Sequence, residues 1–232
     1  MWVQINEEYL DYLREHGDTR VPNQDYGEHK FKPFFPVFEL KNTGIVYVAN
    51  VGHYKETERM MEDTIDFKKI PGSHNNYIGV VHLNMMFPVP KDQIKKYDYK
   101  MIEEKMSWGS SFDFKRHLPR FQQYEKRVKE KDIALSAMTI YEIKNKNLDP
   151  YTARRTLPFL DLEAKLVEYQ INKYIKNQLL QSEKIEVERQ ENDFLINHKN
   201  NVFKVTYNEI EDVEKLYEYV SLGNAPDLDI EL

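Results

Sequence analysis

The chain has 232 residues with 13% aromatic content, which is enough for one sizeable core, or a core with an appendage, and argues against disorder. It contains no cysteine, which excludes a disulfide scaffold, thiolate catalysis and Cys-ligated zinc, and favours a reducing cytoplasm as the location. The formal charge of -6 lies near the C-terminus, because residues 173–232 hold 7 basic and 13 acidic side chains while residues 1–172 hold 26 of each.

The N-terminal segment predicts a helix followed by a β-hairpin. Asn6 is placed to cap a helix whose apolar positions, Tyr9, Leu10 and Leu13, recur at helical spacing, and Gly17 is placed to end it. A polar loop over 20–32 follows. The apolar segments FPVFEL and GIVYVANV are then separated by KNT, which is the pattern of two antiparallel strands. No apolar run has the length of a signal peptide or a membrane span, so we expect a soluble protein.

Two segments after the hairpin predict a helix and a buried strand. KETERMMEDTIDFKK, residues 55–69, alternates charged and apolar side chains at a helical period. YIGVVHLNMMFPVP, residues 77–90, has the composition of a third buried strand that is closed by two prolines. We therefore predict a small antiparallel sheet with inserted helices.

Long helical patterns dominate beyond about residue 113, with Glu and Lys on their polar faces. These helices are predicted over 114–131, 133–146 and 161–180. They are followed by a strand over 184–190, a hairpin over 193–206 that turns at HKNN, a helix over 208–220 and a frayed tail. The sequence thus predicts an α+β fold.

The usual chemical signatures are missing from the sequence. There is no Gly-rich phosphate loop, no His-Glu-x-x-His or paired-His spacing, and no nucleophile elbow. A nucleotide-driven motor, a zinc hydrolase and a serine hydrolase are therefore unlikely classes. What remains is chemistry by positioned His, Lys and Tyr side chains, with no cofactor and no metal.

Such side chains stand together where the second hairpin strand ends. The stretch GIVYVANVGHYKE is dense in β-branched residues up to Val51 and then continues with His53, Tyr54 and Lys55. These three groups can take, give or attract a proton. The end of this strand is therefore the first candidate for a reactive site.

Several strings resemble the ToxN/AbiQ family, the endoribonuclease toxins of type III toxin–antitoxin systems, in which the antitoxin is an RNA. The strings are EYLDYLR, RVPN, KPFFPVFELKNTGIVYVANVGHYK, YIGVVHLNMMFPVP and LPFLDLEAKLVEY. The resemblance covers roughly residues 1–172 and implies a twisted antiparallel sheet with inserted and C-terminal helices. We accordingly predict a toxin-like endoribonuclease core over 1–172 and an acidic C-terminal α/β extension over 173–232.

The resemblance implies a ribonuclease that needs no metal. The ribose 2′-hydroxyl attacks its own 3′-phosphate and leaves a 2′,3′-cyclic phosphate and a 5′-hydroxyl. This reaction needs a group that takes the 2′-hydroxyl proton, a group that protonates the leaving oxygen, and cations that stabilise the charge on the phosphorane.

The family motif at the strand end is a small hydroxyl residue, usually serine, followed two residues on by a lysine. Lys55 keeps the lysine and would hold the scissile phosphate, whereas His53 stands at the serine position. An imidazole that titrates near neutrality is a better general base than a serine hydroxyl. His53 is thus predicted as a catalytic base, the alternative being a site that has lost its activity.

The family also uses a tyrosine and a lysine in the loop before the second strand. Tyr26 and Lys30 have the family spacing of about four residues, yet Lys32 fits better by its distance to the strand. We assign Lys32 to the site and Lys30 to the RNA backbone. Tyr26 would position or protonate the leaving group; a loop aromatic that covers the sheet edge is an equal interpretation.

Other candidates have weaker support. Arg20 and His29 are potential phosphate contacts, and Tyr54 is either a core residue or a stacking surface for a base. His82, inside a buried strand, is expected to be structural. Lys68 and Lys69 are either phosphate contacts or part of a solvated helix end.

The resemblance implies a structured RNA antitoxin as the partner, commonly a pseudoknot cut from a repetitive transcript, in a closed oligomeric assembly with the toxin and with a role in phage defence. A local basic groove around Lys30, Lys32 and Lys55 would bind this RNA, with the acidic extension lying away from it. Two alternatives stay open: a non-catalytic RNA-binding module on the same scaffold, and a ribonuclease toxin controlled by a protein antitoxin.

Overall fold

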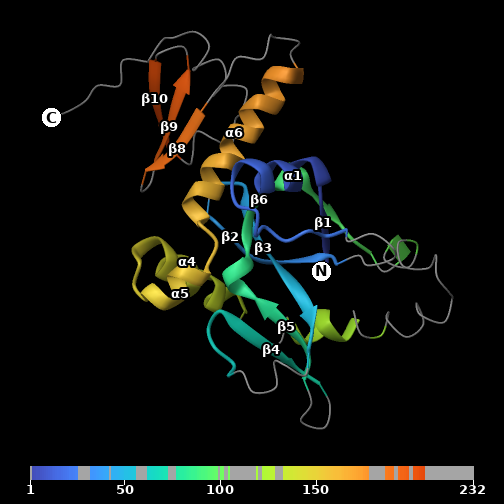
Figure 1. Cartoon of the computed structure of the whole chain (residues 1–232). Coiled ribbons are helices and arrows are strands. Elements are labelled where there is room, and N and C mark those ends of the chain that lie inside the picture. The colour runs from blue at the N-terminus through green and yellow to red at the C-terminus, as the bar shows by residue number, and fades with distance from the viewer. Residues whose placement is uncertain are drawn as a thin grey trace. The chain divides into compact units, whose positions relative to one another are not determined.

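The computed structural model has an α+β fold (Figure 1) and confirms the predicted class. It describes residues 2–25, 32–41, 43–55, 62–72, 77–98, 100–101, 104, 119, 122–128, 133–177, 186–190, 193–198 and 201–206. These residues belong to two compact units, one made of 1–39 and 45–159 and the other of 40–44 and 160–232. Each unit is described by itself below.

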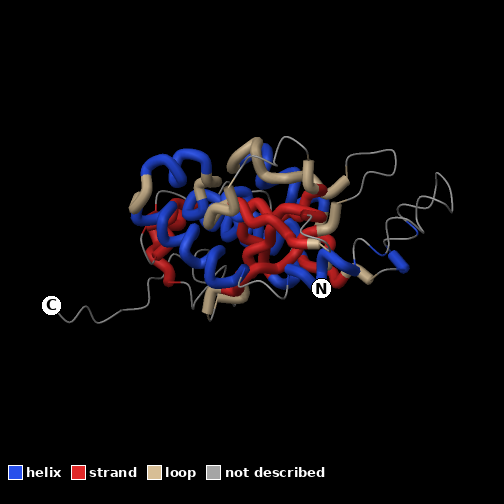
Figure 2. The backbone as a smooth tube through the Cα atoms, turned by 90° about the horizontal axis from the view of Figure 1, so that it is seen from below, coloured by secondary structure: helices blue, strands red, loops and turns tan. Residues whose placement is uncertain are grey.

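The first unit contains an antiparallel sheet of seven strands among the described residues. The strands are β1 (Val3–Ile5), β2 (Phe34–Glu39), β3 (Ile45–His53), β4 (Phe67–Pro71), β5 (Tyr77–His82), β6 (Phe87–Pro90) and β7 (Ile94–Lys96). Their order is β4-β5-β3-β2-β1-β7, and β6 also pairs with β3. Figure 1 labels most of these strands, and Figure 2 draws the strands in red and the helices in blue. The long strand β3 is therefore the centre of the sheet.

The N-terminal helix α1 (Glu7–His16) forms as the sequence predicts. The Asn6 side chain accepts a hydrogen bond from the Glu8 N–H at 2.9 Å, and the Gly17 N–H donates to the Leu13 carbonyl at 2.9 Å. Tyr9, Leu10 and Leu13 are fully buried. The hydroxyl of Tyr9 donates to the Pro88 carbonyl at 2.7 Å and so joins α1 to the strand β6.

The predicted hairpin is also confirmed, with β2 antiparallel to β3 and Phe35 opposite Ala49. Gly44 precedes β3 with a φ of 65°, a left-handed conformation that glycine adopts without a steric penalty. Strand β3 changes partners along its length. Its first part, residues 45–48, pairs with β6, and its last part, residues 51–53, pairs with β5.

The single strand predicted over 77–90 is in fact two strands separated by the short 3-10 helix η2 (Leu83–Met85). Both strands run along the same edge of β3, so the prediction was wrong only at the break. The break follows from contacts that are distant in sequence: the Leu83 N–H donates to the Asp66 carbonyl at 2.9 Å, and the Asn84 carbonyl accepts from the Leu157 N–H at 3.0 Å. These bonds take the backbone of this turn out of the ladder.

The helix predicted over 55–69 is wrong in its described part. Residues 62–64 are not helical, and β4 begins at Phe67 and pairs with β5; residues 56–61 lie outside the described part of the chain. Asp66, 2% exposed, accepts hydrogen bonds from the Thr64 hydroxyl and from Arg155 Nη2, each at 2.7 Å. Pairing with β5 and these polar contacts outweigh the helical periodicity of the segment.

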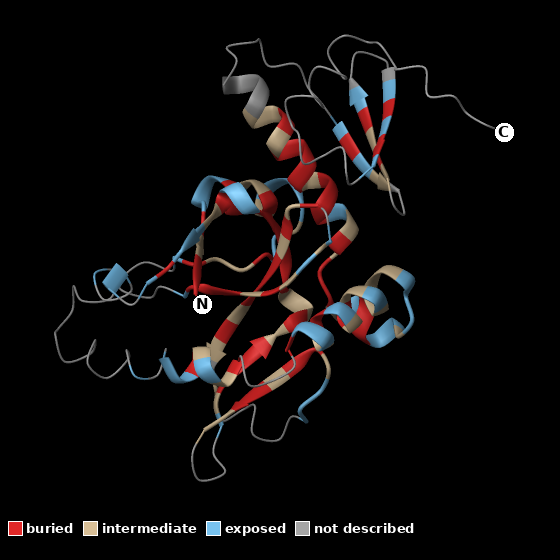
Figure 3. Cartoon of the chain, turned by 180° about the vertical axis from the view of Figure 1, so that it is seen from behind, coloured by how far each residue is buried: buried red, intermediate tan, exposed pale blue. Residues whose placement is uncertain are grey.

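Helices α4 (Ile133–Lys146) and α5 (Pro150–Arg155) follow, and α4 has the predicted bounds. Residues 122–128 are helical within the segment predicted as 114–131. The Tyr141 ring of α4 packs edge-on against Phe38 and Tyr47, with centroids 5.9 and 5.4 Å apart, and stacks on Phe159 at 5.8 Å. This aromatic cluster fixes α4 to β2 and β3, and Figure 3 shows the buried residues of the chain.

The second unit contains α6 (Phe159–Asn177), apart from its first residue, and a three-stranded sheet of β8 (Glu186–Gln190), β9 (Asp193–His198) and β10 (Asn201–Thr206), in the order β10-β9-β8. The predicted strand and hairpin are thus confirmed. The predicted helix over 208–220 and the tail lie outside the described residues. The boundary predicted at residue 172 falls within α6 and stays a prediction.

Among the helices that the structure describes, none combines the length and apolar content needed to cross a membrane.

Replacing Gly79 with alanine is expected to destabilise the sheet. A methyl group there would lie 2.9 Å from the Gly52 carbonyl oxygen and 3.1 Å from Tyr124 Cε1, closer than van der Waals contact allows. Overpacking of this kind costs about 1–3 kcal/mol, to be measured as the free energy of unfolding in urea. Gly52→Ala is the control, because its methyl group would meet Val80 Cγ2 at an ordinary 3.5 Å. Equal stability of the two variants would contradict this account.

Candidate active site at the end of β3

The end of β3 brings the predicted residues to an edge of the sheet. Gly52 pairs with Val80 and His53 with Gly79, after which Tyr54 and Lys55 leave the strand. Lys55 is exposed and Tyr54 is half-buried. The structure confirms that β3 ends at His53, whose side chain is outside the described part, so the catalytic role of His53 stays a prediction.

Lys32 approaches the same end of the sheet from β2. Phe34 lies opposite Asn50, so Lys32, two residues before Phe34, is at the end of the hairpin where β3 finishes. The Lys32 N–H donates to the Gln24 carbonyl at 2.8 Å. Gln24 is buried, and its side-chain amide donates to the Ile5 carbonyl at 2.6 Å while its Oε1 accepts from the Ile5 N–H at 3.0 Å. The backbone before β2 is thus anchored, and the Lys32 side chain is exposed.

A third lysine lies at this end of the sheet. Lys69 was predicted either as a phosphate contact or as part of a solvated helix end, but it belongs to β4 and is only 5% exposed. Its Nζ lies 5.0 Å from the ring centroid of Tyr77 and 5.8 Å from that of Tyr54. The backbone N–H of Lys69 also donates to Asp63 Oδ1 at 3.3 Å.

His82, predicted to be structural, lies beside Gly52, in the part of β3 that pairs with β5. A methyl group on Gly52 would be 3.8 Å from His82 Nε2, so the imidazole lies across the position where Gly52 lacks a side chain. The ring packs edge-on against Phe67 with centroids 5.4 Å apart, and the residue is half-buried. Packing against Phe67 accounts for the position of the His82 ring, which also borders the candidate site.

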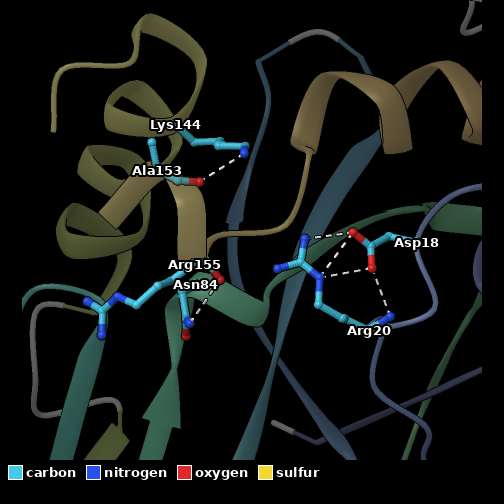
Figure 4. A network of polar contacts seen from close by, with 6 residues as sticks. All are labelled: Asp18, Arg20, Asn84, Lys144, Ala153 and Arg155. Carbon is cyan, nitrogen blue, oxygen red and sulfur yellow. Dashed lines mark hydrogen bonds and ion pairs between the residues drawn. The ribbon is translucent and has the colours of Figure 1, made fainter. Parts of the chain in front are cut away.

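Arg20, predicted to contact RNA, is held by an acid. Its Nη2 lies 2.7 Å from Asp18 Oδ2, and its Nε donates to both carboxylate oxygens at 3.0 and 3.2 Å (Figure 4). The hydrogen bond to Arg20 lowers the pKa of the Asp18 carboxyl, and the same bond raises the pKa of the guanidinium. Any contact of Arg20 with a phosphate must therefore compete with Asp18.

Figure 4 also shows how the turn after β5 is joined to α5. The Asn84 amide donates to the Arg155 carbonyl at 3.4 Å, and Lys144 Nζ donates to the Ala153 carbonyl at 2.9 Å. Arg155 in turn binds the buried Asp66, which precedes β4 by one residue. These bonds position β4 and therefore Lys69.

Three predicted site residues, Tyr26, His29 and Lys30, lie outside the described part of the chain. The choice between Lys30 and Lys32 therefore stays open, as does the role of Tyr26. Within the described ranges, no three His, Asp or Glu side chains gather in a group that could hold a metal ion.

Three solved structures resemble this fold, each with 96% of its chain covered. One, from a study of "selective toxin inhibition by a non-coding RNA pseudoknot", has a TM-score of 0.57, 22% identity and 73% coverage of this chain. Another, from a study of "a bacterial antiviral system" regulated by a processed non-coding RNA, has a TM-score of 0.57, 19% identity and 71% coverage. The third, AbiQ, "a lactococcal anti-phage endoribonuclease", has a TM-score of 0.50, 21% identity and 72% coverage. At these identities the likeness establishes the fold.

A sequence match identifies the family of the protein as well as its fold. No curated protein sequence matches the chain. Residues 1–167 match the family described as "Toxin ToxN, type III toxin-antitoxin system". This match spans β1 to the middle of α6 and includes the end of β3 with Lys55. The chain therefore belongs to the ToxN family of toxins from type III toxin–antitoxin systems.

Proposed function

We propose that the protein is an endoribonuclease toxin that cleaves RNA with its own side chains and without a metal ion. The observation that carries this proposal is the set of groups at the end of β3, where Lys55 and Tyr54 follow the strand and Lys69, Tyr77 and His82 adjoin it. Membership of the ToxN family and the similarity to AbiQ, an anti-phage endoribonuclease, support it.

In the proposed reaction the ribose 2′-oxygen forms a bond to the adjacent phosphorus while the bond from phosphorus to the 5′-oxygen breaks. We assign His53 as the base that takes the 2′-hydroxyl proton, and Tyr26 as the group that positions or protonates the leaving 5′-oxygen. Lys55 and Lys32 stabilise the charge on the phosphorane. Positioned cations at such a centre act without reorganisation, which is why they stabilise the transition state more than water does.

The proposed partner is a structured RNA antitoxin, and two of the similar structures come from work on non-coding RNAs, one of them a toxin-inhibiting pseudoknot. The RNA would bind a groove that contains Lys30, Lys32 and Lys55, in an oligomeric assembly with the toxin. Residues 173–232 hold 13 acidic and 7 basic groups, and this net negative charge would repel RNA. A cytoplasmic location and a role in phage defence complete the proposal.

The direct test is cleavage of a mixed RNA substrate by the purified protein in excess EDTA. We expect products with 2′,3′-cyclic phosphate and 5′-hydroxyl ends, because the 2′-oxygen bonds to the phosphorus and the 5′-oxygen leaves with a proton. His53→Ala should lower the single-turnover rate by about 10²- to 10⁴-fold, the contribution of a positioned base. His53→Ser, which restores the family residue, should recover part of the rate.

Two outcomes would contradict the proposal. Cleavage that stops in EDTA would show that the reaction needs a metal ion. Tight RNA binding without cleavage by the wild-type protein would favour the non-catalytic RNA-binding module, since histidine stands where the family has serine. In either experiment RNA binding should weaken steeply with salt, because binding releases counterions from the phosphates.

A further inference from the structure

Two tyrosines beside the candidate site are arranged around one buried lysine. The ring centroids of Tyr54 and Tyr77 are 5.5 Å apart with an interplanar angle of 46°. The ammonium group of Lys69 lies within 6 Å of both centroids, at 5.8 and 5.0 Å. Tyr54 comes from the end of β3, Tyr77 from the start of β5 and Lys69 from β4. Three strands therefore converge on this small cluster.

The cluster combines a buried charge with an exposed ring. Lys69 is 5% exposed, whereas Tyr77 is 42% exposed. A desolvated ammonium group interacts strongly with a nearby aromatic ring, and this attraction holds both rings in a fixed orientation. Burial of apolar area accounts for only part of the position of Tyr77, because 42% of the residue remains exposed. A fixed and solvent-exposed ring has the geometry of a binding surface.

The position of the rings indicates what would bind to them. Tyr54 is the residue immediately before Lys55, the proposed phosphate ligand, and its ring lies 5.5 Å from that of Tyr77, so the cluster adjoins the end of β3 where the proposed reaction takes place. The flat group closest to a phosphate in RNA is the base of the same nucleotide or of its neighbour. Bases stack on tyrosine rings when they are unpaired, but the faces of paired bases inside a duplex are covered by their neighbours.

We propose that Tyr54 and Tyr77 form a platform on which one unpaired base next to the scissile phosphate stacks, with Lys69 holding the two rings in position. This inference rests on the proposed ribonuclease function and deepens it by assigning the two rings to the nucleotide next to the scissile phosphate. The platform recognises the base by its flat face, so it tolerates all four bases. Lys69 is a positioning residue in this arrangement.

The test measures RNA binding separately from cleavage. The ligand is a fluorescein-labelled, fully 2′-O-methylated single strand, which lacks the attacking hydroxyl, and the dissociation constant is read from fluorescence anisotropy. We expect Tyr77→Ala to weaken binding about 5- to 150-fold, which corresponds to the loss of one stacked base. Tyr77→Phe keeps the ring and should bind like the wild type. Tyr77→Leu keeps apolar bulk without the ring and should bind like Tyr77→Ala.

The matched control is Tyr151→Ala. Tyr151 of α5 is also exposed, at 61%, and also pairs with a cation, the guanidinium of Arg155 at 4.4 Å, but it is not part of the β3 end. Its removal should leave binding unchanged. A blunt-ended RNA duplex with every base paired is the second control, because its affinity should be the same for the wild type and Tyr77→Ala.

A series of abasic substitutions locates the stacked base. One position should weaken binding to the wild type and have no effect on binding to Tyr77→Ala, since the two changes remove the same contact. Lys69→Met should give an intermediate loss of affinity while the ring remains.

Three results would overturn the platform: binding by Tyr77→Ala within twofold of the wild type, equal losses for single-stranded and paired RNA, or a wild-type protein that binds no RNA. Failure of the proposed nuclease function gives a different result. An inactive wild type whose binding still depends on the Tyr77 ring would contradict cleavage and leave the platform in place.

Discussion

Lys55→Ala is expected to lower the single-turnover rate of RNA cleavage about 10²- to 10³-fold, the usual loss for one preorganised donor to a developing oxyanion. The fold should be unaffected, because Lys55 is exposed and lies beyond the last paired residue of β3. Its removal takes no apolar side chain out of the core. Cleavage rates and urea unfolding of the same preparation measure the two effects separately.

The matched control for this variant is Lys146→Ala. Lys146 is an equally charged, exposed side chain at the end of α4, where it faces Glu142 at 4.0 Å. An exposed pair of this kind adds little to stability, so both the cleavage rate and the unfolding curve should stay unchanged. A cleavage rate of Lys55→Ala within fivefold of the wild type would rule Lys55 out as the phosphate ligand. A large loss of stability would assign it a structural role instead.

The second large effect is expected in the unit that contains α6 and the three-stranded sheet. The Arg189 side chain is 3% exposed and its Nε lies 3.3 Å from Oε2 of Glu163, whose side chain is fully buried. Nη1 of Arg189 donates to the Asp193 carbonyl at 2.8 Å, and its guanidinium lies 4.7 Å from the Phe194 ring centroid. Arg189→Met removes the guanidinium that faces the buried carboxylate of Glu163. We expect this change to lower the free energy of unfolding of this unit by about 3–5 kcal/mol.

Hydrogen exchange of the β8–β10 amides in the full-length protein measures this loss. The double variant Arg189→Met/Glu163→Leu should recover most of the protection, because apolar side chains of similar volume replace a buried pair at little cost. Lys204→Met is the control for an exposed pair, since Lys204 Nζ lies 2.7 Å from Asp193 Oδ2 with its side chain 66% exposed. Protection in Arg189→Met equal to that in Lys204→Met would contradict this account.

Local signals were sufficient for much of the fold. The cap at Asn6, the hairpin of β2 and β3, and helix α4 all depend on residues close to one another in the sequence, and each was predicted. The errors arose where distant contacts decide the structure. The break after β5 depends on Asp66 and Leu157, and neither is visible in the pattern of residues 77–90.

The candidate site was predicted only in part, because local patterns show the ends of strands but not the contacts between distant segments. Lys55 and Lys32 flank strands whose apolar patterns are clear, so the ends of those strands were placed correctly. Lys69 reaches the site because β4 pairs with β5, and Tyr77 reaches it because β5 pairs with β3. Residues 55–69 have a helical period, so Lys68 and Lys69 were expected at a solvated helix end or in contact with phosphates. The tertiary pairing that buries Lys69 leaves no mark in local periodicity.

Strand β3 changes partners along its length, so its first part contributes to the core and its last part leads to the candidate site. Residues 45–48 lie between β2 and β6 and contribute Tyr47 and Val48, which are fully buried, whereas residues 51–53 pair with β5 and lead directly into the site. Lys55 is exposed and lies beyond the last paired residue of β3, so its substitution alters the chemistry of the strand end without removing a core contact. The reactivity at this end and the stability of the core can therefore evolve independently.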